Sequence, residues 1–245
     1  MKSSQLIDLF QKSRSDDEIA IIEGVQALKH AVRFGAKIDM YITCDITMLS
    51  DLLAELADDV KNEILKDVTE VDQETFNKLS PRPHRTSVIA LAKRRLYAFK
   101  DIDIDKPIVL LEEPRDLENI GAVIRVAAAA DIGAVVITGP LDIWNPAIIR
   151  GAAGLHWAIP VMNFSQVPSF MRTHKSRPLI SLDPTGKDIN FTSISSNSIL
   201  VFGTERHGIS EKLLAQSDEI VRLPMKEGVS SLNLATSVAA TLYQI

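Results

Sequence analysis

Short apolar runs alternate with helical segments through the C-terminal part of this chain, and this alternation limits the possible folds more than any other feature. The runs are PIVLLEEP, AVVITGP, PLISLDP, SILVFG and EIVRLP, which begin at residues 107, 134, 178, 198 and 219. Strands that are apolar along their whole length and lie between helices are typical of a parallel sheet covered on both faces. We therefore predict an α/β fold with a mostly parallel sheet over residues 107–245.

The first 99 residues show a smaller alternation of the same kind. Strands are expected at 19–23, 38–44 and 87–94, and helices at 3–13, at 24–35 and from about Leu49. The segment KDIDIDKP that follows is charged and ends in proline, which is typical of a linker. We predict a small N-terminal α/β domain over 1–99, a linker over 100–106 and a larger domain over 107–245.

Composition excludes several classes of site. Cys44 is the only cysteine, so an internal disulfide and a cysteine-based zinc site are both excluded. The five histidines do not pair at metal-ligand spacing. The most apolar stretch, IGAVIRVAAAADIGAVVITG, is interrupted by Arg125 and Asp131 and is no membrane span. We expect a cytoplasmic protein with no signal peptide, no metal and no membrane contact.

Charge alone would not suggest a nucleic-acid partner, because the formal net charge is −5. However, residues 75–100 contain no Asp or Glu, and all their charged side chains are basic. This run is either a solvated strand edge with its loop or a patch that contacts phosphates. Composition does not decide between the two.

Three junctions between loops and helices combine small and polar residues. In ENIGAVIRVA, Asn119 lies near a helix start and Arg125 lies among apolar residues. That arginine needs an anionic partner, either a carboxylate of Glu112, Glu113 or Glu205 or a substrate phosphate.

The second junction, VFGTERHGIS, is a strand, a loop punctuated by glycines and a helix. Gly203 and Gly208 allow close approach of the backbone to a ligand. The loop lacks the Gly-Lys-Ser/Thr of a phosphate loop and the spacing of a dinucleotide fingerprint. Its charged residues, Glu205, Arg206 and His207, could equally be ordinary surface charges. We find no nucleophile elbow or Ser/His/Asp signature anywhere in the chain.

The third junction, KEGVSSLNLATSVAATL, begins at Lys226. Ser230 or Ser231 is expected to cap a buried helix, which leaves Asn233 unexplained just inside its first turn. Because the ends of parallel strands share one edge of a sheet, the three junctions suggest a nucleotide-like ligand.

In this order, the three junctions resemble the motifs of the SpoU (TrmH) RNA ribose 2′-O-methyltransferases, a family of the SPOUT class. The matching strings are NIGAVIRVAAA, LVFGTERHGIS and IVRLPMKEGVSSLNLATSVAATLYQ. The resemblance implies a parallel sheet whose C-terminal chain forms a trefoil knot. The N-terminal part is similar to the L30e-like RNA-binding domain often fused to this family.

The resemblance also implies a cofactor and a set of site residues. S-adenosylmethionine would be held by Gly203, Leu223, Met225 and Leu232. The catalytic set would be Asn119, Arg125, Glu205, Ser231 and Asn233. In the family the arginine is often described as the base, but a guanidinium stays protonated. We expect Arg125 to bind the adjacent phosphate and to stabilise the developing alkoxide.

The family implies RNA as substrate, with rRNA favoured over tRNA, and a homodimer formed through the knot. Candidate RNA contacts are Arg82, Arg85, Arg94 and Arg150. An alternative is a non-catalytic RNA-binding or ribosome-assembly factor on the same scaffold. A dinucleotide-binding oxidoreductase is disfavoured because the glycine fingerprint is missing.

Overall fold

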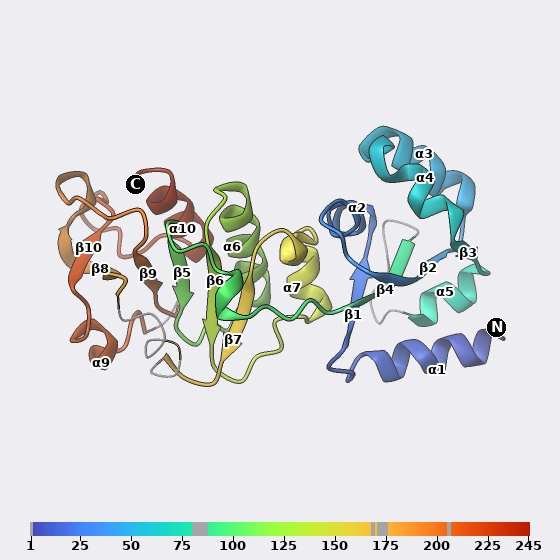
Figure 1. The fold of residues 1–245 in the computed structure, drawn as a ribbon, viewed down its shortest axis with the longest axis horizontal. Coiled ribbons are helices and arrows are strands. Elements are labelled where there is room, and N and C mark those ends of the chain that lie inside the picture. Colours follow the sequence, from blue (N-terminus) through green and yellow to red (C-terminus); the bar gives the residue numbers. More distant parts are fainter. Residues whose placement is uncertain (1, 80–87, 168–169, 171–175, 205–206) are drawn as a thin grey trace. The chain divides into compact units, whose positions relative to one another are not determined.

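The computed structural model describes residues 2–79, 88–167, 170, 176–204 and 207–245. Contacts divide the chain into two compact units (Figure 1). The first unit comprises Met1–Arg95 and Trp144–Ala158, and the second comprises Leu96–Ile143 and Ile159–Ile245. The second unit therefore contains all three polar junctions that the sequence singles out.

A four-stranded mixed sheet forms the centre of the first unit, in the order β1-β4-β2-β3. Buried side chains such as Phe10, Ile21, Ile42 and Phe76 form its core. The strands are β1 (Ile19–Glu23), β2 (Ile38–Thr43), β3 (Val68–Glu70) and β4 (Val88–Lys93). The helices are α1 (Ser3–Ser13), α2 (Val25–Arg33), α3 (Ile46–Leu56), α4 (Asp58–Lys66), α5 (Gln73–Leu79) and α7 (Pro146–Gly151), with the 3-10 turn η2 (Leu155–Trp157).

The helix expected from about Leu49 is in fact two helices. Asp45 caps α3 through a hydrogen bond of 2.8 Å from the Met48 backbone N–H. Ala57 then adopts an extended φ of −161° and ends α3 before α4 begins. Apolar periodicity continues across this break, which explains why one helix was predicted from the sequence.

The segment Trp144–Ala158 packs with the first unit, although it follows strands of the second. Arg150 Nη1 lies 2.8 Å from Glu23 Oε2, and His30 Nδ1 lies 2.8 Å from the Ala153 carbonyl oxygen. Arg95 donates to the Trp157 carbonyl at 2.8 Å. The limits 107–245 that we predict for the larger domain thus include a segment whose contacts lie elsewhere.

Six parallel strands form the sheet of the second unit, in the order β10-β8-β9-β5-β6-β7. This confirms the predicted α/β fold with a parallel sheet. The strands are β5 (Ile108–Leu111), β6 (Ala134–Thr138), β7 (Val161–Phe164), β8 (Leu179–Asp188), β9 (Ile199–Phe202) and β10 (Glu219–Arg222). The helices are α6 (Leu117–Ala129), α9 (Glu211–Leu214) and α10 (Leu234–Leu242), with the 3-10 turns η1 (Phe99–Asp101) and η3 (Ile189–Phe191).

The order in which strands are added to the sheet changes side between β5 and β9. From β5 the chain continues to β6 and β7 on one side, whereas β9 lies on the other side and leads to β10 (Figure 1). The loops that follow β5 and β9, which are neighbouring strands, therefore lead toward opposite edges of the sheet. Such a switch point at the carboxyl ends of parallel strands is where ligands bind in open α/β sheets.

β8 leaves its ladder with β10 in mid-strand. Ser181 pairs with Ile220, but the next residue of β10, Val221, pairs with Lys187. Residues 182–186 therefore bulge out of the ladder toward the carboxyl edge. Gly186 allows the bulge to close, since a Cβ there would lie 2.6 Å from the Ile220 carbonyl carbon.

Candidate active site

A cavity of about 580 Å³ lies at the carboxyl ends of β8, β9 and β10. Its walls come from the β8 bulge, the loop after β9 and the segment between β10 and α10. All four residues expected to hold a cofactor line it, as do two of the expected catalytic residues. These six are Gly203, Leu223, Met225, Leu232, Ser231 and Asn233.

Gly203 sits where no other residue fits. A Cβ on it would lie 2.0 Å from the carbonyl carbon of Gly208, which returns from the other side of the loop. Thr204 and Gly208 exchange backbone hydrogen bonds of 3.1 and 3.0 Å, and Gly208 has a φ of +65°. The loop after β9 is therefore narrow at its base, and Gly203, Thr204 and Gly208 line the cavity there.

Sequence reasoning missed one wall of this cavity. Leu182, Asp183 and Pro184, from the β8 bulge, line it together with Arg222 and Ser237. Asp183 accepts hydrogen bonds from the Thr185 backbone N–H at 2.9 Å and hydroxyl at 2.6 Å. The string Asp-Pro-Thr-Gly is a turn signal that could have indicated this loop.

Asn233 is the N-cap of α10, so the expectation of a serine cap was wrong. Its side-chain oxygen accepts from the backbone N–H groups of Ala235 at 2.9 Å and Thr236 at 3.3 Å. The helix starts at Leu234, later than we predicted. Ser230 and Ser231 are therefore left exposed in the cavity wall rather than used by the helix.

The first and third motifs meet through one hydrogen bond. The side-chain nitrogen of Asn233 donates to the side-chain oxygen of Asn119 at 2.8 Å. Asn119 is held at the start of α6 by Asp116, whose carboxylate caps the helix and accepts from the Asn119 N–H at 2.9 Å. Because the Asn233 oxygen is occupied by α10, the network also determines which way its amide points.

Arg125 is exposed on α6 and does not line the cavity. Of the carboxylates considered as its partners, Glu112 and Glu113 form no ion pair with it, and Glu205 lies outside the described residues. The Glu112 carboxylate instead accepts from the Ser210 backbone N–H and hydroxyl, both at 2.7 Å. The Arg125 side chain is therefore accessible from solvent.

Some predicted site residues are not placed. Glu205, with its neighbour Arg206, lies outside the described residues, and so do Arg82 and Arg85. His207 is exposed, and its backbone N–H donates to the Thr204 hydroxyl at 3.0 Å.

The two other basic candidates have partners in the first unit. The Arg94 Nε–H donates to the Ile19 carbonyl at 2.8 Å. Arg150 pairs with Glu23, whose side chain is 7% exposed, while its own side chain is 39% exposed. Arg150 therefore neutralises a buried carboxylate and keeps part of its guanidinium accessible.

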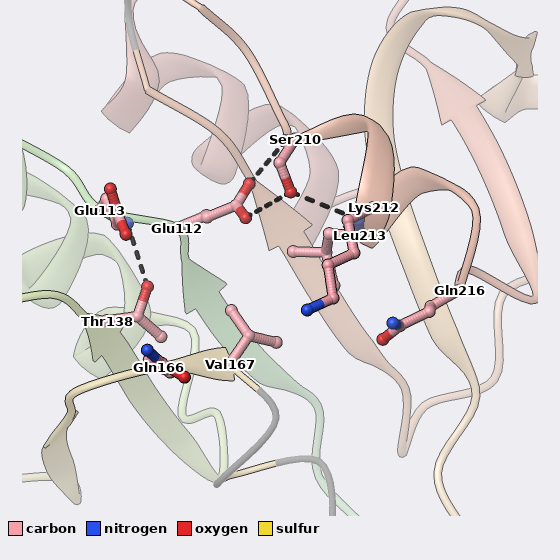
Figure 2. Close-up of a pocket in the computed structure, with 9 residues that line it drawn as sticks. All are labelled: Glu112, Glu113, Thr138, Gln166, Val167, Ser210, Lys212, Leu213 and Gln216. Carbon is pink, nitrogen blue, oxygen red and sulfur yellow. Dashed lines mark hydrogen bonds between the residues drawn. The ribbon is translucent and has the colours of Figure 1, made fainter.

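A second, smaller pocket of about 220 Å³ lies at the ends of β5 and β6 beside α9 (Figure 2). Glu112, Glu113 and Thr138 border it on the sheet side, and Lys212 and Gln216 on the side of α9. Glu113 has a φ of +44° although it is not glycine. Its backbone N–H donates to the Thr138 hydroxyl at 3.1 Å, which holds this conformation.

The part of the chain that the structure describes offers neither a metal site nor a membrane-spanning helix. No group of His, Cys, Asp and Glu side chains among these residues could hold a metal ion. No described helix is both long and apolar enough to cross a membrane.

The chain matches a known protein family and several characterised relatives. The SpoU rRNA Methylase family matches residues 106–243. A 23S rRNA (adenosine(1067)-2′-O)-methyltransferase of Streptomyces laurentii is 24% identical, with 98% of this chain and 90% of the relative covered. A 23S rRNA (uridine(2479)-2′-O)-methyltransferase of Streptomyces viridochromogenes is 26% identical, with 82% and 67% covered. A 23S rRNA (guanosine-2′-O-)-methyltransferase of Bordetella pertussis is 26% identical, with 71% and 75% covered.

Solved structures show the same fold. The SpoU methyltransferase AviRb from Streptomyces viridochromogenes, in complex with AdoMet, superposes with a TM-score of 0.80 at 20% identity, covering 97% of this chain and 95% of that one. An AdoMet-bound rRNA methyltransferase from Sinorhizobium meliloti gives 0.78 at 22% identity, covering 99% and 92%.

Proposed function

This chain belongs to the SpoU rRNA methylase family, and we propose that it transfers a methyl group from S-adenosylmethionine to a ribose 2′-hydroxyl of ribosomal RNA. The relatives named above are 23S rRNA 2′-O-methyltransferases, which favours rRNA over tRNA as the substrate. The protein is therefore an enzyme with S-adenosylmethionine as its cofactor. We also propose that it is cytoplasmic.

The large cavity has the chemistry that this cofactor needs. Its volume of about 580 Å³ lies within the range of roughly 300–1,000 Å³ typical of ligand pockets. Apolar side chains, including Phe202, Leu223 and Leu232, suit an adenine ring, while Asp183 and Ser230 can serve the polar ends. When bound, S-adenosylmethionine supplies a sulfonium methyl group that a nucleophile can displace.

The residues of the chain must position and activate the ribose hydroxyl. This hydroxyl is a weak acid and loses its proton close to the transition state. The exposed Arg125 can bind the neighbouring phosphate and stabilise the oxyanion as charge develops. Asn119, Ser231 and Asn233 supply hydrogen-bonding groups beside the cavity, and Glu205 belongs to the same proposed set.

The hydrogen bond between Asn233 and Asn119 is the observation that carries this proposal. It joins the first motif to the cavity wall formed by the third motif, across 114 positions of sequence. In a site that must hold a hydroxyl against a methyl donor, such rigid placement reduces the entropic cost of reaching the transition state.

The first unit would provide most of the RNA-binding surface. Within the basic run 75–100 the candidates are Arg82, Arg85 and Arg94, and Arg150 reaches the same unit through Trp144–Ala158. We propose that residues 1–99 are an L30e-like RNA-binding domain and residues 107–245 the methyltransferase domain, of which Trp144–Ala158 belongs to the compact unit of the first. Arg94 and Arg150 would then combine a structural contact with a contact to phosphate.

We also propose that the C-terminal chain forms the trefoil knot of this family and that the protein is a homodimer through that region. Large apolar side chains are exposed there. Phe191 is 89% exposed and Tyr243 is 71% exposed. A hydrogen bond from Gln244 to Asn190 joins the two segments that carry them.

Multi-angle light scattering should give a mass twice that of the 27.0 kDa chain. The substitution Phe191→Asp should lower this measured mass.

Titration calorimetry with S-adenosylmethionine and S-adenosylhomocysteine tests the proposed function first. Micromolar binding, followed by transfer of label to rRNA, is the expected result. Binding to RNA without binding to either cofactor form, even when RNA is added to the titration, would indicate the non-catalytic alternative. Binding of NAD instead would contradict the family assignment of the cavity.

A further inference from the structure

We propose that the pocket between Glu113 and Lys212 receives the base of the methylated nucleotide and selects guanine. This inference rests on the proposed methyltransferase activity and adds the identity of the base. The relatives act on adenosine, uridine and guanosine. Family membership therefore leaves the base undetermined, and the residues of this chain must decide it.

The position of the pocket supports this role. It lies where the loops after β5 and β9 diverge, which is the switch point of the sheet. The Glu112 N–H, at the end of β5, donates to the Phe202 carbonyl at 2.9 Å, and Phe202 lines the large cavity. The carboxyl ends of β5 and β9, which border the pocket and the cavity respectively, are therefore neighbours in the sheet. A ribose held at the edge of the large cavity would leave its base within reach of the smaller pocket.

The size and walls of the pocket suit a single base. Its volume of about 220 Å³ is below the roughly 300 Å³ at which pockets for larger organic ligands begin. Val167 and Leu213 supply apolar surface for a ring, and Gln166 and Gln216 add amide groups (Figure 2). Single bases that leave the helical stack are commonly bound in such pockets through their edges and faces.

The charged groups of the pocket determine which base fits. Glu112 is occupied by Ser210, so the carboxylate left for a ligand is that of Glu113. Within the described residues, neither Glu113 nor Lys212 forms an ion pair. A phosphate would meet repulsion from the carboxylates. An uncharged base that carries hydrogen-bond donors next to an acceptor could donate to the Glu113 carboxylate and accept from the Lys212 ammonium.

Guanine has this arrangement on its Watson–Crick edge. Its N1–H and N2–H groups can both donate to the Glu113 carboxylate, and its O6 can accept from the Lys212 ammonium. Uracil has only one donor, between two acceptors. Adenine and cytosine place a ring acceptor next to their amino group, and that acceptor would face the carboxylate. These unpaired acceptors make the wrong bases unfavourable.

The backbone at Glu113 agrees with a functional side chain. A φ of +44° costs free energy for any residue except glycine. Strained backbone conformations are retained where they serve a functional site. A charged residue in this conformation therefore indicates that its side chain contributes to function.

Nucleoside analysis tests the proposal. Total RNA from cells that lack this protein is incubated with the full-length enzyme and S-adenosylmethionine carrying a deuterated methyl group. The RNA is then digested and its nucleosides are measured by mass spectrometry. Labelled 2′-O-methylguanosine is the expected product. Labelled 2′-O-methyladenosine, -uridine or -cytidine would overturn the choice of guanine while supporting the methyltransferase activity. No labelled nucleoside would overturn both proposals.

A paired substitution of enzyme and substrate assigns the recognition to Glu113. Glu113→Gln keeps the size of the side chain, and it should lower kcat/KM for the guanosine RNA on the order of tenfold to a hundredfold. Cofactor binding should not change. Replacing the target guanosine by inosine removes the N2 amino group, which should slow the wild-type enzyme but not Glu113→Gln.

Glu118→Gln, on the first turn of α6 and outside the pocket, is the matched control. A Glu113→Gln enzyme that still prefers guanosine over inosine as strongly as the wild type would contradict the assignment.

Discussion

The side-chain amide of Asn233 forms hydrogen bonds through both its oxygen and its nitrogen. Its oxygen caps α10 by accepting from Ala235 and Thr236, and its nitrogen donates to Asn119 at 2.8 Å. No other uncharged side chain of this length carries an acceptor and a donor side by side. The residue therefore contributes both to helix stability and to the alignment of the two motifs.

Asn233→Asp should separate these two tasks. Aspartate is as good an N-cap as asparagine, so thermal unfolding should change little. The donor to Asn119 is lost, and methyl transfer should fall by at least tenfold. Asn233→Ala should lose activity too and, because the cap is also lost, about 1 kcal/mol of stability.

Asn145 provides a matched control for this substitution. It caps α7 in the same way, with its oxygen accepting from the Ala147 N–H at 2.9 Å. Asn145→Asp should leave transfer unchanged. If Asn233→Asp retained full activity, the bond to Asn119 would have no role in the reaction.

Arg125→Lys should distinguish a cation from a base. A lysine keeps the positive charge but not the planar fork of the guanidinium. We expect kcat to fall while the shape of the pH–rate profile is retained, because the charge of Arg125 acts on phosphate and oxyanion. A new titration near the pKa of lysine in the kcat profile would instead indicate a base at this position.

Gly154→Ala should unfold or strongly destabilise the first unit. A Cβ there would lie 2.0 Å from the Ala27 carbonyl oxygen, and the residue has a φ of +75°. Gly35 has the same φ, but a Cβ on it would meet only an Arg95 nitrogen at 3.7 Å. Urea unfolding should show a loss of about 1 kcal/mol for Gly35→Ala and clearly more for Gly154→Ala. Equal losses would mean that the contact with Ala27 is not tight in solution.

Alkaline pH should destabilise the protein through Tyr41, whose side chain is buried in β2. Burial, with smaller effects from Glu63 and Asp67, raises the pKa of Tyr41 from 10.0 to about 12. The unfolded chain therefore ionises first, so stability falls between pH 10 and 12, by about 2–3 kcal/mol in total.

Tyr41→Phe should remove most of this decline in urea unfolding between pH 9 and 11. Tyr243→Phe, at a residue that is 71% exposed, should leave it intact. The same slope in all three proteins would show that the Tyr41 phenol is not shielded as the fold indicates.

Glu113→Gly should stabilise the protein and impair it at the same time. Glycine adopts a φ of +44° without steric cost, and after the entropy of the unfolded chain is counted we expect a gain of about 0.5–1 kcal/mol. Loss of the carboxylate should lower kcat/KM for RNA. Ala153→Gly, at a φ of +50° in the first unit, should stabilise without affecting catalysis. A destabilised Glu113→Gly would show that the side chain supports the fold instead.

Local patterns predicted most of the elements of both units. Runs of apolar residues identified β5, β6 and β9, whose side chains are fully buried, because a strand covered on both faces must be apolar throughout. The position of the α10 cap was missed because Ser230, Ser231 and Asn233 are all good capping residues. Only the packed backbone determines which of them precedes the first helical turn.

The sequence by itself determined the parallel α/β sheet and the three junctions, since both depend on residues close together in the chain. The tertiary structure decided what those junctions do. It paired Asn119 with Asn233, left Arg125 exposed and placed Trp144–Ala158 with the first unit. It also brought Glu113 and Lys212 to the wall of one pocket. These outcomes depend on contacts between distant segments, and the free energy of such contacts comes from the whole fold rather than from any local run of residues.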